Sequence, residues 1–172
     1  YGHSRIYHQA MQEAETQAKK ENLGIWNPAT NAHSEKRDYP LLLPWWKRRG
    51  EDIAHYRQQG IQQGILSVRL HYDEIQKAAE NQEEITLLID LQKGIERWLH
   101  DQALIFSGSK FHRLSVWIPD IYQPQAQEVI RLIKERYAEY GRGYAYIRGK
   151  TKMYKGRPEL ILTSVEQIRD VC

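Results

Sequence analysis

The segment from residue 142 to residue 157 combines the two side-chain types that hold single-stranded nucleic acid. It contains six basic residues and no acidic one, together with three tyrosines. Because side chains alternate between the two faces of a β-strand, a strand here presents one basic and aromatic face: Tyr144, Tyr146, Arg148, Lys150, Lys152 and Tyr154. Such rings stack on bases and such cations contact phosphates. The alternative is that the rings pack against the N-terminal helices and the cations are only solvated.

Two further regions carry residues of the same types. A predicted strand at 113–119 places Arg113 and Trp117 on one face and Leu114 and Val116 on the other. Two predicted loops, 93–102 and 155–157, contribute the remaining candidates: Lys93, Arg97, Trp98, Lys155 and Arg157. We expect all these residues, with the face of 144–154, to form one nucleic-acid-binding site.

A second basic and aromatic run extends from Trp45 to Arg49. Interleaved rings and cations are typical of nucleic-acid contacts, but paired tryptophans at the start of a helix also serve as an anchor between two parts of a chain. We favour the anchor.

Residues that would carry catalysis are sparse. His71, Asp73 and Glu74 lie close together, but their spacing does not place two metal ligands on one face of a helix. Cys172 is the single cysteine, which excludes an internal disulfide and a cysteine-based zinc cluster. The sequence has no glycine-rich phosphate loop and no Gly-x-Ser-x-Gly motif. We therefore expect no catalytic residue, no metal site and no cofactor in this chain.

Helices are predicted in the N-terminal part of the chain. Residues 4–23 are rich in Ala, Gln, Glu and Lys, with Ser4 as the N-cap and Gly24 as a left-handed stop. A polar linker is predicted at 27–40, a helix that begins at Pro44 follows it, and a shorter helix is predicted at 72–80.

Strands dominate the rest of the chain. They are predicted at 85–92, 103–108, 113–119, 143–154 and 158–164, with a helix at 124–141 between the third and the fourth. This order is that of the OB-fold. The expected fold class is thus α+β, with N-terminal helices followed by a five-stranded OB-type Greek-key β-barrel. The expected divisions are a terminal helix at 1–26, a linker and helical segment at 27–82 and an OB-fold domain at 83–172.

The composition is that of a folded protein. Of the 172 residues, 41% are hydrophobic and 27% are charged, which argues against disorder. The net charge of +3 is too small to indicate nucleic-acid binding by itself. The longest apolar run, 41–46, is far shorter than the roughly 20 residues that span a bilayer. We expect no membrane segment, and no signal peptide is visible in the first residues.

Residues 12–26, QEAETQAKKENLGIW, resemble the final helix of the staphylococcal-nuclease-like (thermonuclease) family. There, an acidic, alanine-rich turn leads into Ala-Lys-Lys and then Leu-Gly or Leu-Asn, Ile and Trp. The matching residues include Ala18, Lys19, Lys20, Leu23, Gly24, Ile25 and Trp26. The resemblance implies that a nuclease barrel precedes Tyr1 in a longer parent protein. Its catalytic residues and its calcium would belong to that barrel and not to this chain.

Residues 146–168, YIRGKTKMYKGRPELILTSVEQI, are similar to the last two strands of nucleic-acid-binding OB domains of the tRNA-anticodon and single-strand DNA type. Those domains commonly contain Gly-Lys, then Tyr-x-Gly-Arg-Pro, an alternating apolar strand and a Ser-x-x-Gln-Ile tail. Domains of this kind also follow nuclease domains, which implies an accessory role.

The function expected from these observations is a nucleic-acid-binding accessory module of a thermonuclease-like protein, with single-stranded DNA or RNA as its ligand. Two alternatives stand beside it: a structural or protein-interaction module, and a part of a metal-dependent phosphodiesterase whose catalytic half lies upstream. The first helix carries a stripe that includes Ala14 and Ala18. We expect it to pack on a second copy of the chain, as a homodimer, or to project away from the strands.

Overall fold

The computed structural model describes residues 6–27, 29 and 39–172. Contacts between residues divide the chain into two compact units, 1–44 and 45–172. Each unit is described by itself. Ser4 and most of the linker predicted at 27–40 lie outside the described residues.

The first unit contains the helix α1 (His8–Lys20) and a 3₁₀ turn, Gly24–Trp26. The helix confirms the described part of the prediction at 4–23. It ends with Asn22 in the left-handed conformation, with φ of 51°, and the Leu23 N–H donates to the Ala18 carbonyl at 2.9 Å. Gly24 is also left-handed, with φ of 56°, but the left-handed stop of the helix comes two residues earlier, at Asn22, because asparagine tolerates this conformation too.

Helix α3 (Tyr39–His55) passes from the first unit into the second. It begins five residues before Pro44, so the predicted start is wrong. Proline lacks an N–H and therefore removes one helical hydrogen bond. Pro44 is the sixth residue of α3, beyond the first four whose N–H groups have no intrahelical partner, so the helix continues past the loss of one bond. A single π-helical turn, Tyr56–Gly60, follows α3.

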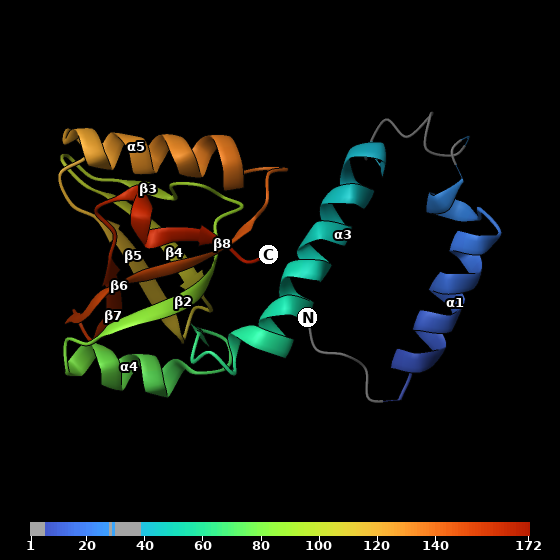
Figure 1. Ribbon diagram of the computed structural model, residues 1–172, viewed down its shortest axis with the longest axis horizontal. Helices are drawn as coiled ribbons and strands as arrows, with labels where there is room; N and C mark the ends of the chain where they lie inside the picture. Colours follow the sequence, from blue (N-terminus) through green and yellow to red (C-terminus); the bar gives the residue numbers. More distant parts are fainter. Residues whose placement is uncertain (1–5, 28, 30–38) are drawn as a thin grey trace. The chain divides into compact units, whose positions relative to one another are not determined.

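The second unit also contains α4 (Tyr72–Glu80) and α5 (Pro124–Leu132), which continues into a π-helical turn, Ile133–Tyr137. Figure 1 shows α4 and α5 on opposite sides of the strands. Both helices were predicted. Proline opens α5, where its fixed φ suits the first helical position.

The strands form one mixed open sheet of eight members. They are β1 (Leu66–Ser67), β2 (Glu84–Asp90), β3 (Arg97–Trp98), β4 (Ala103–Gly108), β5 (Arg113–Ile118), β6 (Tyr144–Tyr154), β7 (Arg157–Ile161) and β8 (Ile168–Asp170). The order is β1-β2-β6-β7-β5-β4-β3, and β8 also pairs with β6. The five predicted strands are present. The three others have only two or three residues each, too few to show an alternating pattern.

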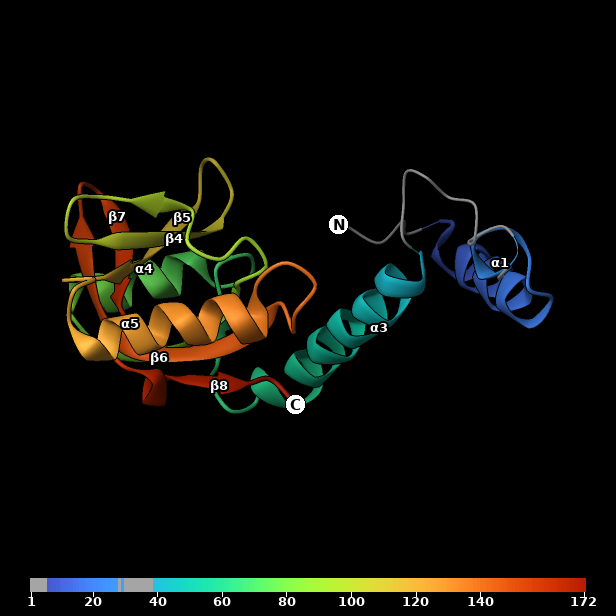
Figure 2. The same cartoon turned by 90° about the horizontal axis from the view of Figure 1, so that it is seen from above.

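The pairing directions distinguish this sheet from a simple meander. β5 pairs with β7 in parallel, and β1 pairs with β2 in parallel, while the other neighbours are antiparallel. Figure 2 shows β4 and β5 on the side of the unit away from β8.

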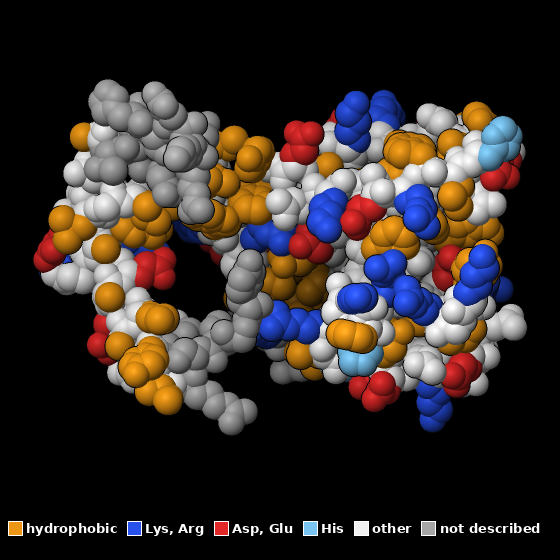
Figure 3. Space-filling view, turned by 180° about the vertical axis from the view of Figure 1, so that it is seen from behind, with side chains coloured by type: hydrophobic (Ala, Val, Ile, Leu, Met, Phe, Trp, Pro, Cys, Tyr) orange, Lys and Arg blue, Asp and Glu red, His pale blue; other side chains and the backbone are white. Residues whose placement is uncertain are grey.

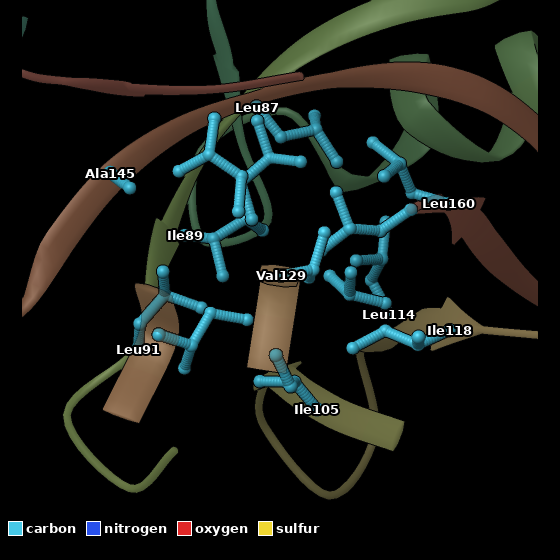
Figure 4. Close-up of a cluster of buried hydrophobic side chains, with 14 of the residues drawn as sticks. Leu87, Ile89, Leu91, Ile105, Leu114, Ile118, Val129, Ala145 and Leu160 are labelled. Atoms are coloured by element: carbon cyan, nitrogen blue, oxygen red, sulfur yellow. The ribbon is translucent and has the colours of Figure 1, made fainter. Parts of the chain in front are cut away.

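One face of β4 and β5 and the inner sides of α4 and α5 enclose the main core. Figure 4 shows part of it, with side chains from β2, β4, β5, β6, β7 and α5 directed toward one another. Its fully buried members include Ile75, Leu87, Ile105, Val129 and Leu160. Burying one such aliphatic side chain stabilises the fold by about 1.5–3 kcal/mol, so these residues fix the sheet that carries the site.

A second, smaller cluster forms between the π-helical turn and β6. Its buried members are Tyr56, Ile65, Leu88, Tyr146 and Val171. At Gly60 an added Cβ would lie 2.6 Å from a ring carbon of Tyr56 and 2.7 Å from the Tyr146 hydroxyl oxygen. Only glycine fits at this close approach.

Candidate nucleic-acid interface

The register of the strands places a row of side chains on the outer face of the sheet. Directly paired residues point to the same side. Trp117 on β5 pairs with Leu104 on β4 and with Ile161 on β7. One row further along, Glu159 on β7 pairs with Lys152 on β6. The pairing thus puts Trp117 and Lys152, both expected at the site, on one face.

Figure 3 looks onto this side of the second unit and shows Lys and Arg side chains interleaved with hydrophobic ones. We call this surface the outer face. Its members are Arg97, Leu104, Phe106, Arg113, Trp117, Lys150, Lys152, Tyr154, Arg157, Glu159 and Ile161.

Lys152 connects two groups of the outer face. Its Nζ lies 3.7 Å from the centroid of the Trp117 ring and 3.3 Å from Glu159 Oε1. The Trp117 indole Nε1 donates to Gln102 Oε1 at 2.8 Å. Burial raises the pKa of the Glu159 carboxyl, and the hydrogen bond and charge of Lys152 oppose that rise. The ammonium therefore holds a buried carboxylate and covers one side of the Trp117 ring.

A second cation–ring pair lies at the start of β5. The Arg113 guanidinium is 5.0 Å from the centroid of the Phe106 ring. The Phe106 N–H donates to Glu96 Oε1 at 3.1 Å, and Lys93 Nζ lies 3.3 Å from Glu96 Oε2. Lys93 is thus placed beside the β3–β4 edge and is paired with a carboxylate.

The hairpin from β6 to β7 carries three further candidates. Tyr154 pairs with Arg157 across a two-residue turn in which Lys155 and Gly156 have φ of 49° and 75°. Positive φ at both central positions is the type I′ geometry that fits the twist of a hairpin. Lys155 Nζ lies 5.2 Å from the centroid of the Tyr154 ring. The turn predicted at 155–157 is confirmed, and its side chains are exposed.

Tyr144 and Tyr146 do not join the exposed part of this face. Tyr146 is 3% exposed and its ring centroid lies 6.5 Å from that of Tyr56. The Arg49 guanidinium covers Tyr144 at 4.2 Å from the ring centroid and forms a bidentate ion pair with Asp90. For these two rings the alternative holds that they pack against the helical segment, and their expected place in the nucleic-acid site is corrected here. Strand alternation identifies the face of each residue, but it does not show that the end of α3 and the π-helical turn cover the first half of β6.

Trp45 behaves as the predicted anchor. Its ring meets that of Tyr140 edge-on at 5.8 Å between centroids. Arg49 lies 4.9 Å from the centroid of the Trp45 ring, and the same guanidinium covers Tyr144. The end of α3 is thereby fixed to the start of β6.

The remaining candidates lie at the margins. Arg148 forms an exposed ion pair with Glu84 on β2, whereas Lys150 is exposed on the same strand. Arg97 and Trp98 form the short strand β3, so part of the predicted loop at 93–102 is a strand paired with β4. Trp98 pairs with Ala103 and is therefore at the far end of β4 from Arg113.

Two aromatic residues were missed by the sequence reasoning. Phe106 lies on the outer face beside Ser115, and Phe111, in the β4–β5 connection, is 82% exposed. Phe106 could have been predicted, because side chains alternate along β4 and Leu104 and Phe106 lie on the face opposite to Ala103 and Ile105. The exposure of Phe111 could not, because the residues of a loop follow no repeating pattern.

A buried polar network surrounds Asp52, which is fully buried. The Cys172 thiol donates to Asp52 Oδ1 at 3.1 Å, and Arg142 Nη2 lies 4.0 Å from the same oxygen. Burial raises the pKa of Asp52, partly offset by Cys172 and Arg142. Nearby, the Tyr137 hydroxyl donates to Asp170 Oδ1 at 2.7 Å, and its pKa is raised to about 12, first by burial. These contacts hold the C-terminal strand to the end of α3.

Within residues 6–27, 29 and 39–172, no group of three or more His, Cys, Asp or Glu side chains is arranged to hold a metal ion. None of the described helices is long and apolar enough to cross a bilayer. The fold is that of an α+β protein with N-terminal helices and a mixed open sheet of eight strands. No family model matches the chain, and no curated protein matches it.

Proposed function

We propose that the chain is a nucleic-acid-binding module whose ligand is single-stranded DNA or RNA and whose binding surface is the outer face. The observation that carries this proposal is the strand register. It gathers Arg97, Arg113, Lys150, Lys152 and Arg157 on one face with aromatic rings. Of the two carboxylates on this side, Glu159 is buried and paired with Lys152, and Glu84, which lies opposite Lys150, is paired with Arg148.

The sheet topology supports an OB-type barrel as the finer description of the second unit. Of the long strands, β2 pairs with β6, β6 with β7, β7 in parallel with β5, and β5 with β4. β2 and β3 stand near the two ends of this path, yet only residues 91–96 separate them along the chain. If β2 and β3 are two halves of one bent first strand, that strand pairs with both ends of the sheet and closes it into a barrel. The helix α5 between β5 and β6 also fits this fold.

Binding through these cations should depend on salt. Each phosphate that a Lys or Arg contacts on a single strand releases counterions and contributes about −0.7 to the slope of log K against log salt. With about four contacted phosphates, raising salt fourfold should weaken binding by about 50-fold. The bases would be held by stacking, without a sequence code.

The proposal extends to an attached nuclease domain and to a second copy of the chain. The resemblance of residues 12–26 favours a module attached to a thermonuclease-like domain that would supply catalysis and calcium. The exposed side chains of α1, among them Tyr7 and Met11, favour a surface for a second copy of the chain. In that arrangement the module would hold a strand for cleavage elsewhere and would not cleave it.

A structural role is the second candidate, and one observation favours it for part of the surface. The rings of Tyr144 and Tyr146 are covered by residues 45–60. The first half of β6 therefore joins the helical segment to the sheet. We confine the nucleic-acid site to the second half of β6 and to β3, β4, β5 and β7.

Fluorescence anisotropy with labelled oligothymidylate, oligouridylate and duplex DNA, at about 50 and 200 mM salt, tests the proposal. We expect tighter binding of the single strands, weakened by salt. A variant with Arg113→Ala, Lys150→Ala and Arg157→Ala should lose it, while Lys47→Ala and Arg57→Ala, two changes of exposed cations on the helical segment, should not. Wild-type chain that binds none of the three at low salt would exclude this function.

A further inference from the structure

The loop between β4 and β5 projects from the side of the unit that bears the outer face (Figure 2). Its tip presents the sequence Lys110, Phe111, His112. Phe111 is 82% exposed. Among the residues that the structure describes, no ring or cation contacts the Phe111 ring, whereas the rings of Trp117 and Phe106 are each covered by a cation. The Phe111 ring is thus exposed without the cover that the rings of Trp117 and Phe106 have.

The tip is a well-defined turn. The N–H groups of Phe111 and His112 both donate to Ser109 Oγ, at 3.3 and 3.0 Å, and the Ser109 N–H donates to the His112 carbonyl at 2.8 Å. Gly108 has φ of 96°, and an added Cβ there would lie 2.1 Å from the His112 carbonyl oxygen. The turn therefore requires this glycine and fixes the backbone that presents Phe111.

Tyr72, the first residue of α4, supports the tip. The His112 ring lies 4.7 Å from the Tyr72 ring, and the Tyr72 hydroxyl donates to the Arg113 carbonyl at 3.4 Å. These contacts hold the loop without covering Phe111. An apolar ring kept exposed on a supported turn is ready to stack on a ligand without losing much conformational freedom on binding.

Charge distinguishes this end of the sheet from the other. β5 and β7 are parallel, so the β4–β5 and β6–β7 hairpins turn at the same end of these strands. Residues 107–113 and 153–157 contain four Lys or Arg and no acid: Lys110, Arg113, Lys155 and Arg157. The nearby first turn of α4 carries two acids, Asp73 and Glu74. The positive charge exceeds the negative charge here, which favours a polyanion.

The opposite end has exposed aromatic residues too, but a different charge. Trp98 lies beside the start of β4, and Tyr122, which is 67% exposed, follows the end of β5. Asp101 and Asp120 flank these residues along the chain, and Asp120 accepts hydrogen bonds from the Tyr122 N–H and the Gln123 side chain. Arg97 lies at this end too, but the two carboxylates outnumber it and disfavour a phosphate chain.

We propose that Phe111 at the tip of the β4–β5 hairpin stacks on a base of single-stranded nucleic acid, while Lys110 and Arg113 contact the flanking phosphates. This inference rests on the proposed function and deepens it, because it places the principal stacking ring at the tip and not at Trp117. Trp117 keeps its Lys152 cover, since Lys152 also neutralises the buried Glu159.

The test is anisotropy of a labelled oligothymidylate of about 12 nucleotides with four forms of the 172-residue chain. Phe111→Ala should weaken binding about 5- to 150-fold, the range found when a stacked ring is removed. Phe111→Trp should retain it, and the emission of the added indole should fall on binding. The matched control is Tyr122→Ala, which removes an aromatic ring that is 67% exposed at the opposite end and should bind as the wild type does.

The outcomes separate this inference from the function on which it rests. Wild-type binding that Phe111→Ala leaves within twofold would overturn the role of the tip and leave the module a nucleic-acid binder. Absence of wild-type binding would overturn both. Tighter capture of a polyglutamate peptide than of the oligothymidylate, lost in Phe111→Ala, would show that the tip binds an acidic protein segment. Circular dichroism of each variant confirms that the exposed substitution leaves the fold intact.

Discussion

Removal of the Lys152 ammonium should destabilise the protein in a pH-dependent manner. Glu159 is 5% exposed, and Lys152 is the cation that pairs with it. Removing one partner of a fully buried ion pair costs about 3–5 kcal/mol. The Lys152 side chain is 35% exposed, so solvent screens part of the pair. We therefore expect Lys152→Ala to lower the free energy of unfolding by about 1–3 kcal/mol at neutral pH.

The sign of the pH dependence follows from the carboxyl group. Burial raises the pKa of Glu159 in the folded state, and without Lys152 the pKa should rise further. Above the unfolded pKa of about 4.3, the unfolded state then binds fewer protons than the folded state, so stability falls as pH rises. The deficit of Lys152→Ala should be greatest near neutrality. Below about pH 4 it should shrink to the lost cation–ring contact, about 0.5–1 kcal/mol.

Thermal and urea unfolding measured between about pH 4 and pH 7.5 check this, since each kcal/mol corresponds to about 3–5 °C for a unit of this size. Adding Glu159→Gln to Lys152→Ala should recover most of the loss, because no buried charge then remains. Lys150→Ala, an exposed neighbour on the same face of β6, should change stability by less than about 0.5 kcal/mol. A Lys152→Ala variant no less stable than Lys150→Ala, or a deficit that grows with acid, would refute the reasoning.

Two further predictions concern the covered rings and the first helix. The Tyr146 hydroxyl is buried and has no hydrogen-bond partner among the described residues, so Tyr146→Phe should raise the free energy of unfolding by about 0.5–1.5 kcal/mol; urea denaturation that shows a loss would mean that the hydroxyl has a partner. If α1 docks on a second copy of the chain, sedimentation equilibrium should show a dimer that Met11→Glu with Ala14→Glu dissociates, because two charges would enter an apolar contact. A wild-type chain that is monomeric at about 100 μM would exclude that dimer.

The order of helices and strands was predictable from the sequence because each long element carries a pattern. β5 begins with alternating polar and apolar residues, β4 is a short apolar run that ends at Ser107 and Gly108, and Pro124 marks the start of α5. The start of α3 was not predictable in this way, because Pro44 looks like a first helical residue and in fact lies within the helix. The strands β1, β3 and β8 depend on their neighbours and not on a pattern of their own.

The candidate site was predictable only in part. Alternation correctly placed Trp117 and Lys152 on one face, since both lie within regular strands. It did not decide whether Tyr144 and Tyr146 are exposed or covered, because the elements that cover them come from residues 45–60, far away in sequence. The exposure of Phe111 could not be predicted from the sequence, because it depends on the contacts that hold the loop in place.

Titration of the ¹⁵N-labelled chain with oligothymidylate, followed by amide chemical shifts, tests the central claim most directly. We expect the perturbed amides to cluster on β4, β5, the second half of β6 and β7, with the largest changes at the hairpin tip around Phe111. We expect no change around Tyr146, which lies in the second core cluster. Shifts confined to the helical segment or to the Tyr146 cluster, or no shifts at low salt, would contradict the assignment of the outer face as a nucleic-acid-binding surface.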